Sequence, residues 1–98
     1  MPFLIYSTDK PDHGDLRNEV RAEHLAYLQS HIDRLLAGGA VLNNDSGAPF
    51  GSAIILDTED QAEAEQFAAN DPFTKAGLFE SVVVTRWRKA IFDGNMMV

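Results

Sequence analysis

Alternation of apolar and polar residues predicts four strands and two long helices along the chain. Short runs of β-branched and aromatic residues, bounded by Gly, Pro, Asp and Asn, are typical of strands, and apolar residues three and four apart are typical of helices. The predicted strands are residues 3–8, 40–42, 51–57 and 78–89; the predicted helices are residues 16–37, residues from a cap at 58 to about 70, and one turn at 73–77. This β-α-β-β-α-β order is that of the ferredoxin-like α+β fold, an antiparallel sheet with two helices on one face.

Local signals indicate where these helices begin and end. Asp15 is the expected N-cap of the first helix, and the glycines at 38–39 are its expected end. Residues 58–61 match a capping box, with Thr at the cap and Gln three residues later. The Asp-Pro pair at 71–72 ends the second helix, because proline disfavours a helical conformation in the residue before it. Residues 92–98 are a tail without a clear period, and no linker divides the chain, so residues 1–98 are expected to form one domain.

The first predicted helix carries two ionisable residues on the side that should face the core. Four apolar residues mark that side: Leu25, Leu28, Ile32 and Leu35. Extending this stripe back by one turn brings Arg21 into its middle and His24 to its flank. Because buried polar groups cost free energy unless they are paired, we expect this half of the helix to lie over a cavity.

The predicted sheet is apolar on both faces. Leu4 and Ile5 point to opposite sides of the first strand, and Ile54 and Ile55 do the same in the third. Two helices can cover only one face, so the other face needs a cover from outside the chain. A homodimer formed through this face is the expected state, and a monomer with an exposed apolar sheet is the alternative.

Composition removes several functional classes. The 98-residue chain contains no cysteine, which excludes disulfides, thiolate metal sites and cysteine catalysis. Its formal net charge of −7 argues against nucleic acid as a partner, and the basic residues at 86–89 are typical of a solvated strand edge. No apolar run is long enough to span a membrane, and the apolar start lacks the basic flank of a signal peptide, so a cytoplasmic location is the default expectation.

No spacing in the sequence favours a metal ion or a cofactor. His24 and His31 lie on nearly the same side of the predicted helix, but seven residues span about 10.5 Å along the axis, too far for one zinc ion. Nucleotide-binding glycine motifs and the elbow of a serine nucleophile are also absent. We therefore expect neither a metal ion nor a cofactor.

The predicted topology gathers polar residues at one edge of the domain. The end of the first strand, the start of the first helix, the loop at 43–50 and the end of the second helix meet there. A histidine and a carboxylate brought together suit acid–base chemistry. The residues expected at this edge are His24, Asp71, Arg21, Tyr6, Phe50 and Phe73.

Each of these residues has an ordinary structural explanation as well. His24 can be a hydrogen-bonded core histidine, and Asp71 can be a helix-stop residue. Arg21 can hold an anionic or phenolic oxygen of a ligand, or simply pair with Asp71. Tyr6, Phe50 and Phe73 would form apolar walls for a small, cyclic ligand.

Five stretches of the chain resemble the YciI-like (YCII-related) family: residues 3–7, 21–28, 68–73, 76–80 and 83–87. The combination of R-x-x-H in the first helix with D-P-F after the second is the most specific part. The resemblance implies a dimeric α+β barrel in which His24 and Asp71 are the proposed catalytic pair. Some relatives look like lyases that remove chloride from hydroxylated chloroaromatics. Residues 41–46 depart from the Gly-Pro-like turn usual in the family. Because this loop would line the pocket, the identity of the substrate is the part of the resemblance that transfers least to this chain.

The sequence therefore supports three hypotheses. The first is a small-molecule enzyme, of lyase or isomerase type, that uses His24 as general acid or base oriented by Asp71. The second is a non-catalytic ligand-binding or accessory module with the same pocket. The third is a dimer whose polar pair is purely structural.

Overall fold

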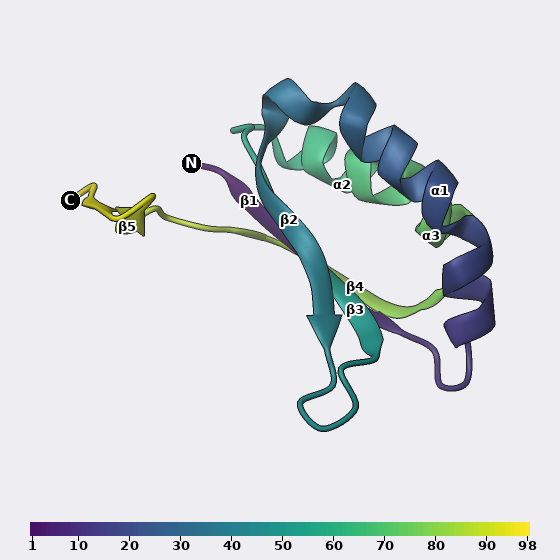
Figure 1. The fold of residues 1–98 in the computed structure, drawn as a ribbon. Coiled ribbons are helices and arrows are strands. Elements are labelled where there is room, and N and C mark those ends of the chain that lie inside the picture. Colours follow the sequence, from purple (N-terminus) through teal and green to yellow (C-terminus); the bar gives the residue numbers. More distant parts are fainter.

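The computed structural model describes all 98 residues as a four-stranded antiparallel sheet with helices packed on one face (Figure 1). The elements are β1 (Phe3–Asp9), α1 (Gly14–Ser30), the 3₁₀ turn η1 (Ile32–Arg34), β2 (Leu35–Leu42), β3 (Pro49–Leu56), α2 (Gln61–Asn70), α3 (Pro72–Lys75), β4 (Phe79–Arg86), β5 (Ile91–Phe92) and β6 (Asn95–Met96). The strand order is β2-β3-β1-β4, with β1 and β3 in the centre. This is the ferredoxin-like α+β arrangement that the sequence predicts.

The first helix is shorter than predicted and ends at Ser30. Side chains cap its last turn, because the Ser30 hydroxyl donates to the Tyr27 carbonyl at 2.7 Å and the His31 ring nitrogen lies 2.9 Å from the same oxygen. The glycines predicted to end the helix lie inside β2, where Gly38 is paired with Ile54. Residues 32–34 form the 3₁₀ turn η1, and pairing with β3 overrides the helical spacing of residues 35–37.

The two predicted N-caps also move. Asp15 lies inside the first turn of α1, where its negative charge interacts favourably with the positive end of the helix dipole. No side chain caps the N-terminus of this helix. Asp60, and not Thr58, caps α2 by accepting from the Ala62 N–H at 3.0 Å. Thr58 instead accepts from the Asp60 N–H at 3.2 Å, so the true cap lies two residues after the predicted one.

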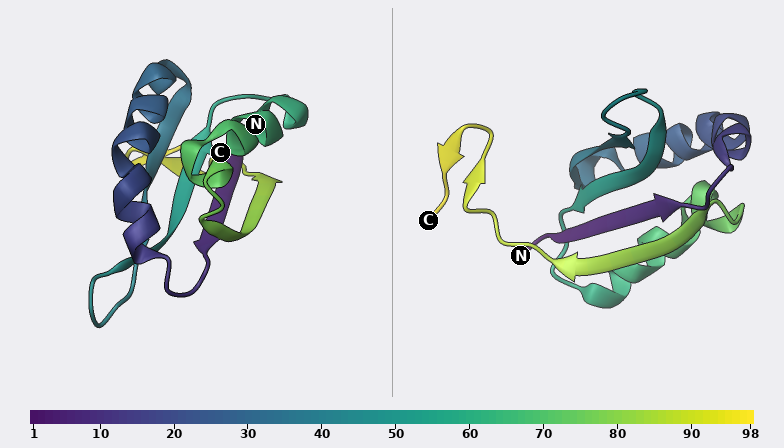
Figure 2. Two further views of the ribbon diagram at one scale, coloured as in Figure 1. Left: turned by 90° about the vertical axis from the view of Figure 1, so that its right-hand side faces the viewer. Right: turned by 90° about the horizontal axis from the view of Figure 1, so that it is seen from below.

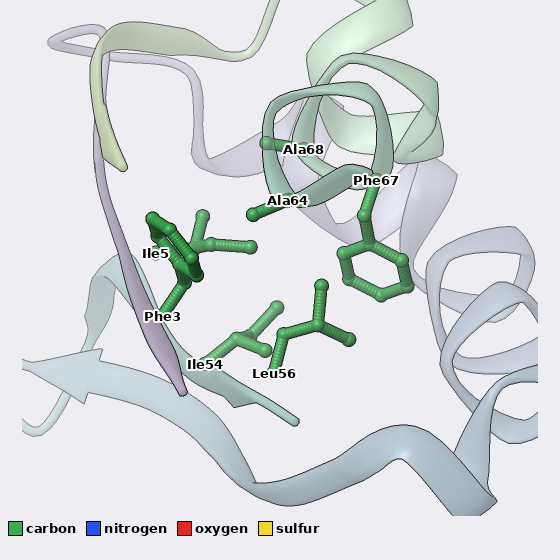
Figure 3. Packing of buried hydrophobic residues seen from close by; sticks show 7 residues of the cluster. All are labelled: Phe3, Ile5, Ile54, Leu56, Ala64, Phe67 and Ala68. Atoms are coloured by element: carbon green, nitrogen blue, oxygen red, sulfur yellow. The ribbon is translucent and has the colours of Figure 1, made fainter. Parts of the chain in front are cut away.

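The hydrophobic core lies between the central strands and α2 (Figure 3). Its buried side chains are Phe3, Ile5, Ile54, Leu56, Ala64, Phe67 and Ala68. Two small alanines on α2 face the sheet, which lets this helix approach closely. By contrast, α1 contributes only Tyr27 and Leu28, each partly buried. The apolar stripe predicted on α1 is wrong for Leu25 and Ile32, which are 43% and 57% exposed.

The second face of the sheet carries no helix (Figure 2). Leu4 and Tyr6 of β1 point to this face, because their neighbours Phe3, Ile5 and Ser7 are buried under the helices. Ile55 is the pairing partner of Leu4, and Val83 of Tyr6, so both belong to the same face. We call these four residues the open face.

The C-terminal residues, predicted to be a tail without a period, include the two-stranded hairpin β5–β6. Asp93 and Gly94 form its turn, both with positive φ, as the type I′ hairpin turn requires. The hairpin stands away from the sheet and helices (Figures 1 and 2), and its Ile91 and Met96 are 62% and 69% exposed.

None of the helices is both long and apolar enough to cross a membrane.

Candidate active site

The helix-covered face of the sheet changes from apolar to polar along its strands. In β1, the buried Phe3 and Ile5 are followed by Ser7 and Asp9 on the same side. In β3, Ser52 is the pairing partner of Ser7 and is also buried. This polar end of the face lies where β1 leads into α1.

The helix α1 places two buried ionisable side chains on this side. Arg17 and His24 are 6% and 7% exposed, and their separation of seven positions makes about two turns, so both lie on one helix face.

His24 is hydrogen-bonded to a buried carboxylate. Its Nδ1 lies 2.8 Å from Oδ1 of Asp71, which is 4% exposed. Asp71 is held in turn as the N-cap of α3, where the same oxygen accepts the Phe73 N–H at 2.9 Å. Pro72 begins α3 at a position where the missing N–H costs nothing, so the Asp-Pro-Phe sequence builds this cap locally.

The partner of Nδ1 determines the state of the other ring nitrogen. A carboxylate can only accept, so the hydrogen-bond network assigns the proton of neutral His24 to Nδ1 and leaves a lone pair on Nε2. Nε2 has no hydrogen-bond partner within the chain. Every fully buried side-chain nitrogen or oxygen does have a partner, so Nε2 is not fully buried. Nε2 therefore reaches solvent-accessible surface on the side of the ring away from Asp71.

Phe73 lies beside both ionisable residues of α1. The His24 ring stacks on it with the centroids 3.9 Å apart and the planes inclined by 14°. The Arg17 guanidinium lies over the same ring, its Cζ 4.7 Å from the centroid. The Phe73 side chain is 1% exposed, so both ionisable groups pack against a buried ring.

Arg17 is a functional candidate that reasoning from the sequence missed. Its Nε and Nη2 donate to the two oxygens of Asp9 at 2.7 and 2.9 Å, in the bidentate geometry that arginine favours. Nη2 also donates to the Gly51 carbonyl at 3.0 Å and lies 3.2 Å from the Ser52 hydroxyl. The sequence signal that could have identified Arg17 is its seven-residue spacing from His24. It was overlooked because the apolar residues used to orient the helix place Arg21, and not Arg17, in the middle of the buried side.

Tyr27 closes the site on the side of α2. Its hydroxyl donates to the Phe67 carbonyl at 2.8 Å. Burial, and then the negative charge of Asp71, raise the pKa of Tyr27 above its ordinary value. The phenol therefore stays protonated and serves as a donor near neutral pH.

Three of the six predicted site residues come together, namely His24, Asp71 and Phe73. The prediction that Arg21 lies in the middle of the buried side of α1 is wrong, because Arg21 is exposed and Arg17 takes that place.

The two remaining aromatic residues do not line the site within one chain. Tyr6 is on the open face, across the sheet from His24, and is 37% exposed. Phe50, at the start of β3, is 41% exposed and makes no aromatic contact with Phe73 or His24.

A groove of about 530 Å³ runs beside the site between α1 and α3. Its lining residues are Val20, Glu23, Tyr27, Asn70, Pro72, Lys75 and Ala76. They flank His24 and Asp71 in sequence without including either. Nowhere in the chain do three or more His, Asp or Glu side chains gather closely enough to hold one metal ion.

Comparisons with known proteins show what the chain is similar to. Protein YciI of Escherichia coli O6:H1 is 41% identical over 96 residues, covering 91% of this chain and 98% of the relative. An uncharacterized protein of Haemophilus influenzae is 35% identical over the same coverage.

Among solved structures, 5-chloro-2-hydroxyhydroquinone dehydrochlorinase (TftG) from Burkholderia phenoliruptrix AC1100, in complex with 2,5-dihydroxybenzoquinone, superposes with a TM-score of 0.85. It is 40% identical and covers 90% of this chain and 94% of its own. Residues 1–88 match the YCII-related domain. The chain therefore belongs to the YCII-related family.

Proposed function

We propose that this protein is a small-molecule enzyme of lyase type in which His24 transfers a proton and Asp71 orients it. The observation that carries the proposal is the buried His24–Asp71 hydrogen bond of 2.8 Å, which leaves Nε2 free at accessible surface. The similarity to a dehydrochlorinase supports a small, cyclic, hydroxylated substrate.

The arrangement suits an elimination. In a dehydrochlorination the substrate loses a proton and a chloride ion, and the electron pair left by the proton forms the new double bond as chloride departs. Nε2 of His24 would accept the proton. The negative charge of Asp71 stabilises the imidazolium that forms and keeps Nδ1–H in place.

A non-catalytic binding or accessory module with the same pocket is the alternative. It needs the shape of the site and the hydrogen bonds, but no proton transfer at Nε2. A third possibility is a purely structural pair, for which replacement of His24 changes stability alone.

Replacing His24 by Asn tests these alternatives. We expect a folded protein that has lost turnover of 5-chloro-2-hydroxyhydroquinone by at least about a hundredfold, the usual size of a general acid–base contribution. The control is His13→Asn, which removes another imidazole of the chain, near the start of α1. Equal turnover in His24→Asn and wild type would refute the proposal. Absence of turnover in the wild type, with binding retained, would favour the binding module.

We further propose that the protein is a homodimer formed through the open face. Leu4, Tyr6, Ile55 and Val83 present an apolar surface that no element of the chain covers. The open face of a second copy of the chain would cover this apolar surface, because a two-fold symmetric contact brings the same residues together from both copies.

A further inference from the structure

We propose that the C-terminal hairpin β5–β6 packs into a groove between α2 and β4 of a second copy of the chain. This inference rests on the proposed homodimer, to which it adds a contact outside the open face, and it does not depend on the proposed enzyme activity. Both strands of the hairpin come after residues 1–88, the part of the chain that matches the YCII-related domain.

One side of the hairpin is apolar and uncovered. Ile91 and Met96 are directly paired, so their side chains point to the same side, and they are 62% and 69% exposed. Phe92 belongs to the other side, and the Lys89 ammonium lies 5.2 Å from its ring centroid. Two short strands bury too little surface to be stable alone in water, so the apolar side needs a partner.

The chain directs the hairpin away from its own sheet. The Trp87 N–H donates to the Pro2 carbonyl at 2.9 Å, which continues the contact between the first and last strands of the sheet past the end of β4. Residues 88–90 lead onward from there, and the hairpin stands apart from the sheet and helices (Figures 1 and 2). A segment held in this way can pack on another molecule without unfolding its own domain, as exchanged elements do in swapped dimers.

The groove lies at the edge of the sheet and has a volume of about 330 Å³. The residues that line it are Glu65, Ala68, Ala69, Thr74, Val82 and Val84. The strand partners of Val82 and Val84 are buried under the helices, so both valines point to the helix-covered face. Val82 is nevertheless 38% exposed, because the helices leave this edge of the face uncovered.

The strand β4 that forms one wall of the groove has a free edge. It is the last strand of the sheet and pairs only with β1, so the N–H and C=O groups on its outer side lack a strand partner. Val83 of the open face lies between the two groove valines in the same strand. A second copy seated on the open face would therefore adjoin this groove.

The hairpin segment and the groove differ in charge. Residues 87–98 contain two basic residues and one acidic residue, whereas the rest of the chain contains six basic and fourteen acidic ones. Residues 57–65, which lead into α2, contain five acidic residues and no basic one. Glu65 at the rim of the groove has no cationic partner in its own chain, and Arg88 has no anionic one. These charges favour a contact between the hairpin of one copy and the groove of the other.

Disulfide cross-linking tests the contact directly, because the chain contains no cysteine of its own. Ile91→Cys is co-expressed with a tagged Val82→Cys protein, so that the mixed disulfide differs in mass from either homodimer. We expect the mixed disulfide to be the main oxidised product on a non-reducing gel, since the bond requires Cβ atoms about 3.5–4.5 Å apart. Met96→Cys with tagged Ala69→Cys is a second pair, which allows for a small shift of the hairpin in the groove.

The control replaces the groove cysteine by Ala22→Cys, on the exposed side of α1, and should give only background product. Failure of both groove pairs to cross-link would overturn the proposal, and so would equal cross-linking to Ala22→Cys. A protein that carries Val82→Cys and Ile91→Cys together gives a further test. A disulfide formed within that single chain would mean that the hairpin packs on its own groove, and would overturn the proposal as well.

Met96→Asp measures how much the contact contributes to the dimer. The substitution removes an apolar side chain from the contact and brings a negative charge toward Glu65. We therefore expect the dissociation constant of the dimer to rise about tenfold or more, as measured by analytical ultracentrifugation over a concentration series. Ala22→Asp adds the same charge on α1 and should change the constant by less than about twofold. An unchanged constant in Met96→Asp would overturn the proposal.

The results also separate the hairpin contact from the open face. A dimeric wild type in which neither pair cross-links would refute the hairpin contact and leave the open-face dimer standing. Cross-linking of both pairs, together with a Val83→Arg variant that stays dimeric, would support the hairpin contact and refute the open face. A monomeric wild type without cross-links would refute both.

Discussion

The imidazole of His24 lies nearly parallel to the ring of Phe73, with the centroids 3.9 Å apart, and the backbone N–H of Phe73 binds the same Asp71 oxygen as the imidazole does. Phe73 therefore holds the histidine in two ways, through its ring and through the carboxylate that its own backbone positions.

Replacing Phe73 by Leu should loosen His24 without disturbing the Asp71 cap. The backbone N–H is retained, while the stacking is lost and a small void is left, so we expect a loss of about 1–2 kcal/mol in the free energy of unfolding. Urea unfolding measures this loss. Phe92→Leu, in the hairpin away from the site, is the matched control. A stability within error of wild type would show that the stack contributes nothing.

The His24–Asp71 hydrogen bond should appear as a coupling energy. In a double-mutant cycle of His24→Asn and Asp71→Asn, we expect the two losses to be non-additive by about 1.5–3 kcal/mol, the range for hydrogen bonds to charged groups. The cycle is measured by urea unfolding of the four proteins. Simple additivity would mean that the 2.8 Å contact does not stabilise the fold.

Gly51 should tolerate no side chain. A Cβ there would lie 2.5 Å from the carbonyl oxygen of Ser7, a backbone atom of the central strand that cannot move alone. We expect Gly51→Ala to cost about 1–3 kcal/mol, as overpacking does, and to shift the strand that contacts Arg17. Gly39→Ala in β2 is the control, because nothing lies within 4 Å of its added Cβ. Thermal melts of the two variants would coincide if the close approach were relieved without cost.

The sheet order could be predicted from local signals in the sequence, and the His24–Asp71 pair from the predicted topology together with the family resemblance. The strand runs are short and well bounded, and the Asp-Pro-Phe stretch builds its own cap. The predicted end of α1 was wrong because residues 31–37 have helical spacing, although 32–34 form the 3₁₀ turn η1 and pairing with β3 makes 35–37 part of a strand. Arg17 was missed for a related reason. The buried side of the first helix was predicted from apolar residues that include Leu25, which is 43% exposed in the structure. The partners that bury Arg17 come from β1 and β3, distant in sequence.

Tyr27 should make stability depend on alkaline pH. The folded protein raises the pKa of Tyr27, so above the ordinary tyrosine value of about 10 the unfolded chain ionises first. This stabilising contribution is fully present below that value and is lost as pH rises through the pKa of the folded state. Tyr27→Phe should be less stable than wild type at pH 7, by about 1 kcal/mol for the hydrogen bond to Phe67, with the difference shrinking at high pH. Urea unfolding at pH 7 and above pH 10 measures it, and a difference that stays constant would contradict the assignment.

The proposed dimer can be tested by a substitution on the open face that leaves the fold of one chain intact. Val83 is 49% exposed on the open face, paired with Tyr6 of the neighbouring strand. An arginine there places a charge, and its copy from the partner, in the middle of an apolar contact, where desolvation is costly. We therefore expect Val83→Arg to elute with the mass of one chain in size-exclusion chromatography with light scattering, and wild type with that of two. Ala22→Arg, on the exposed side of α1, introduces the same charge away from the open face and should remain a dimer. A dimeric Val83→Arg variant would show that the interface is not at the open face. A monomeric wild type would refute the proposed dimer.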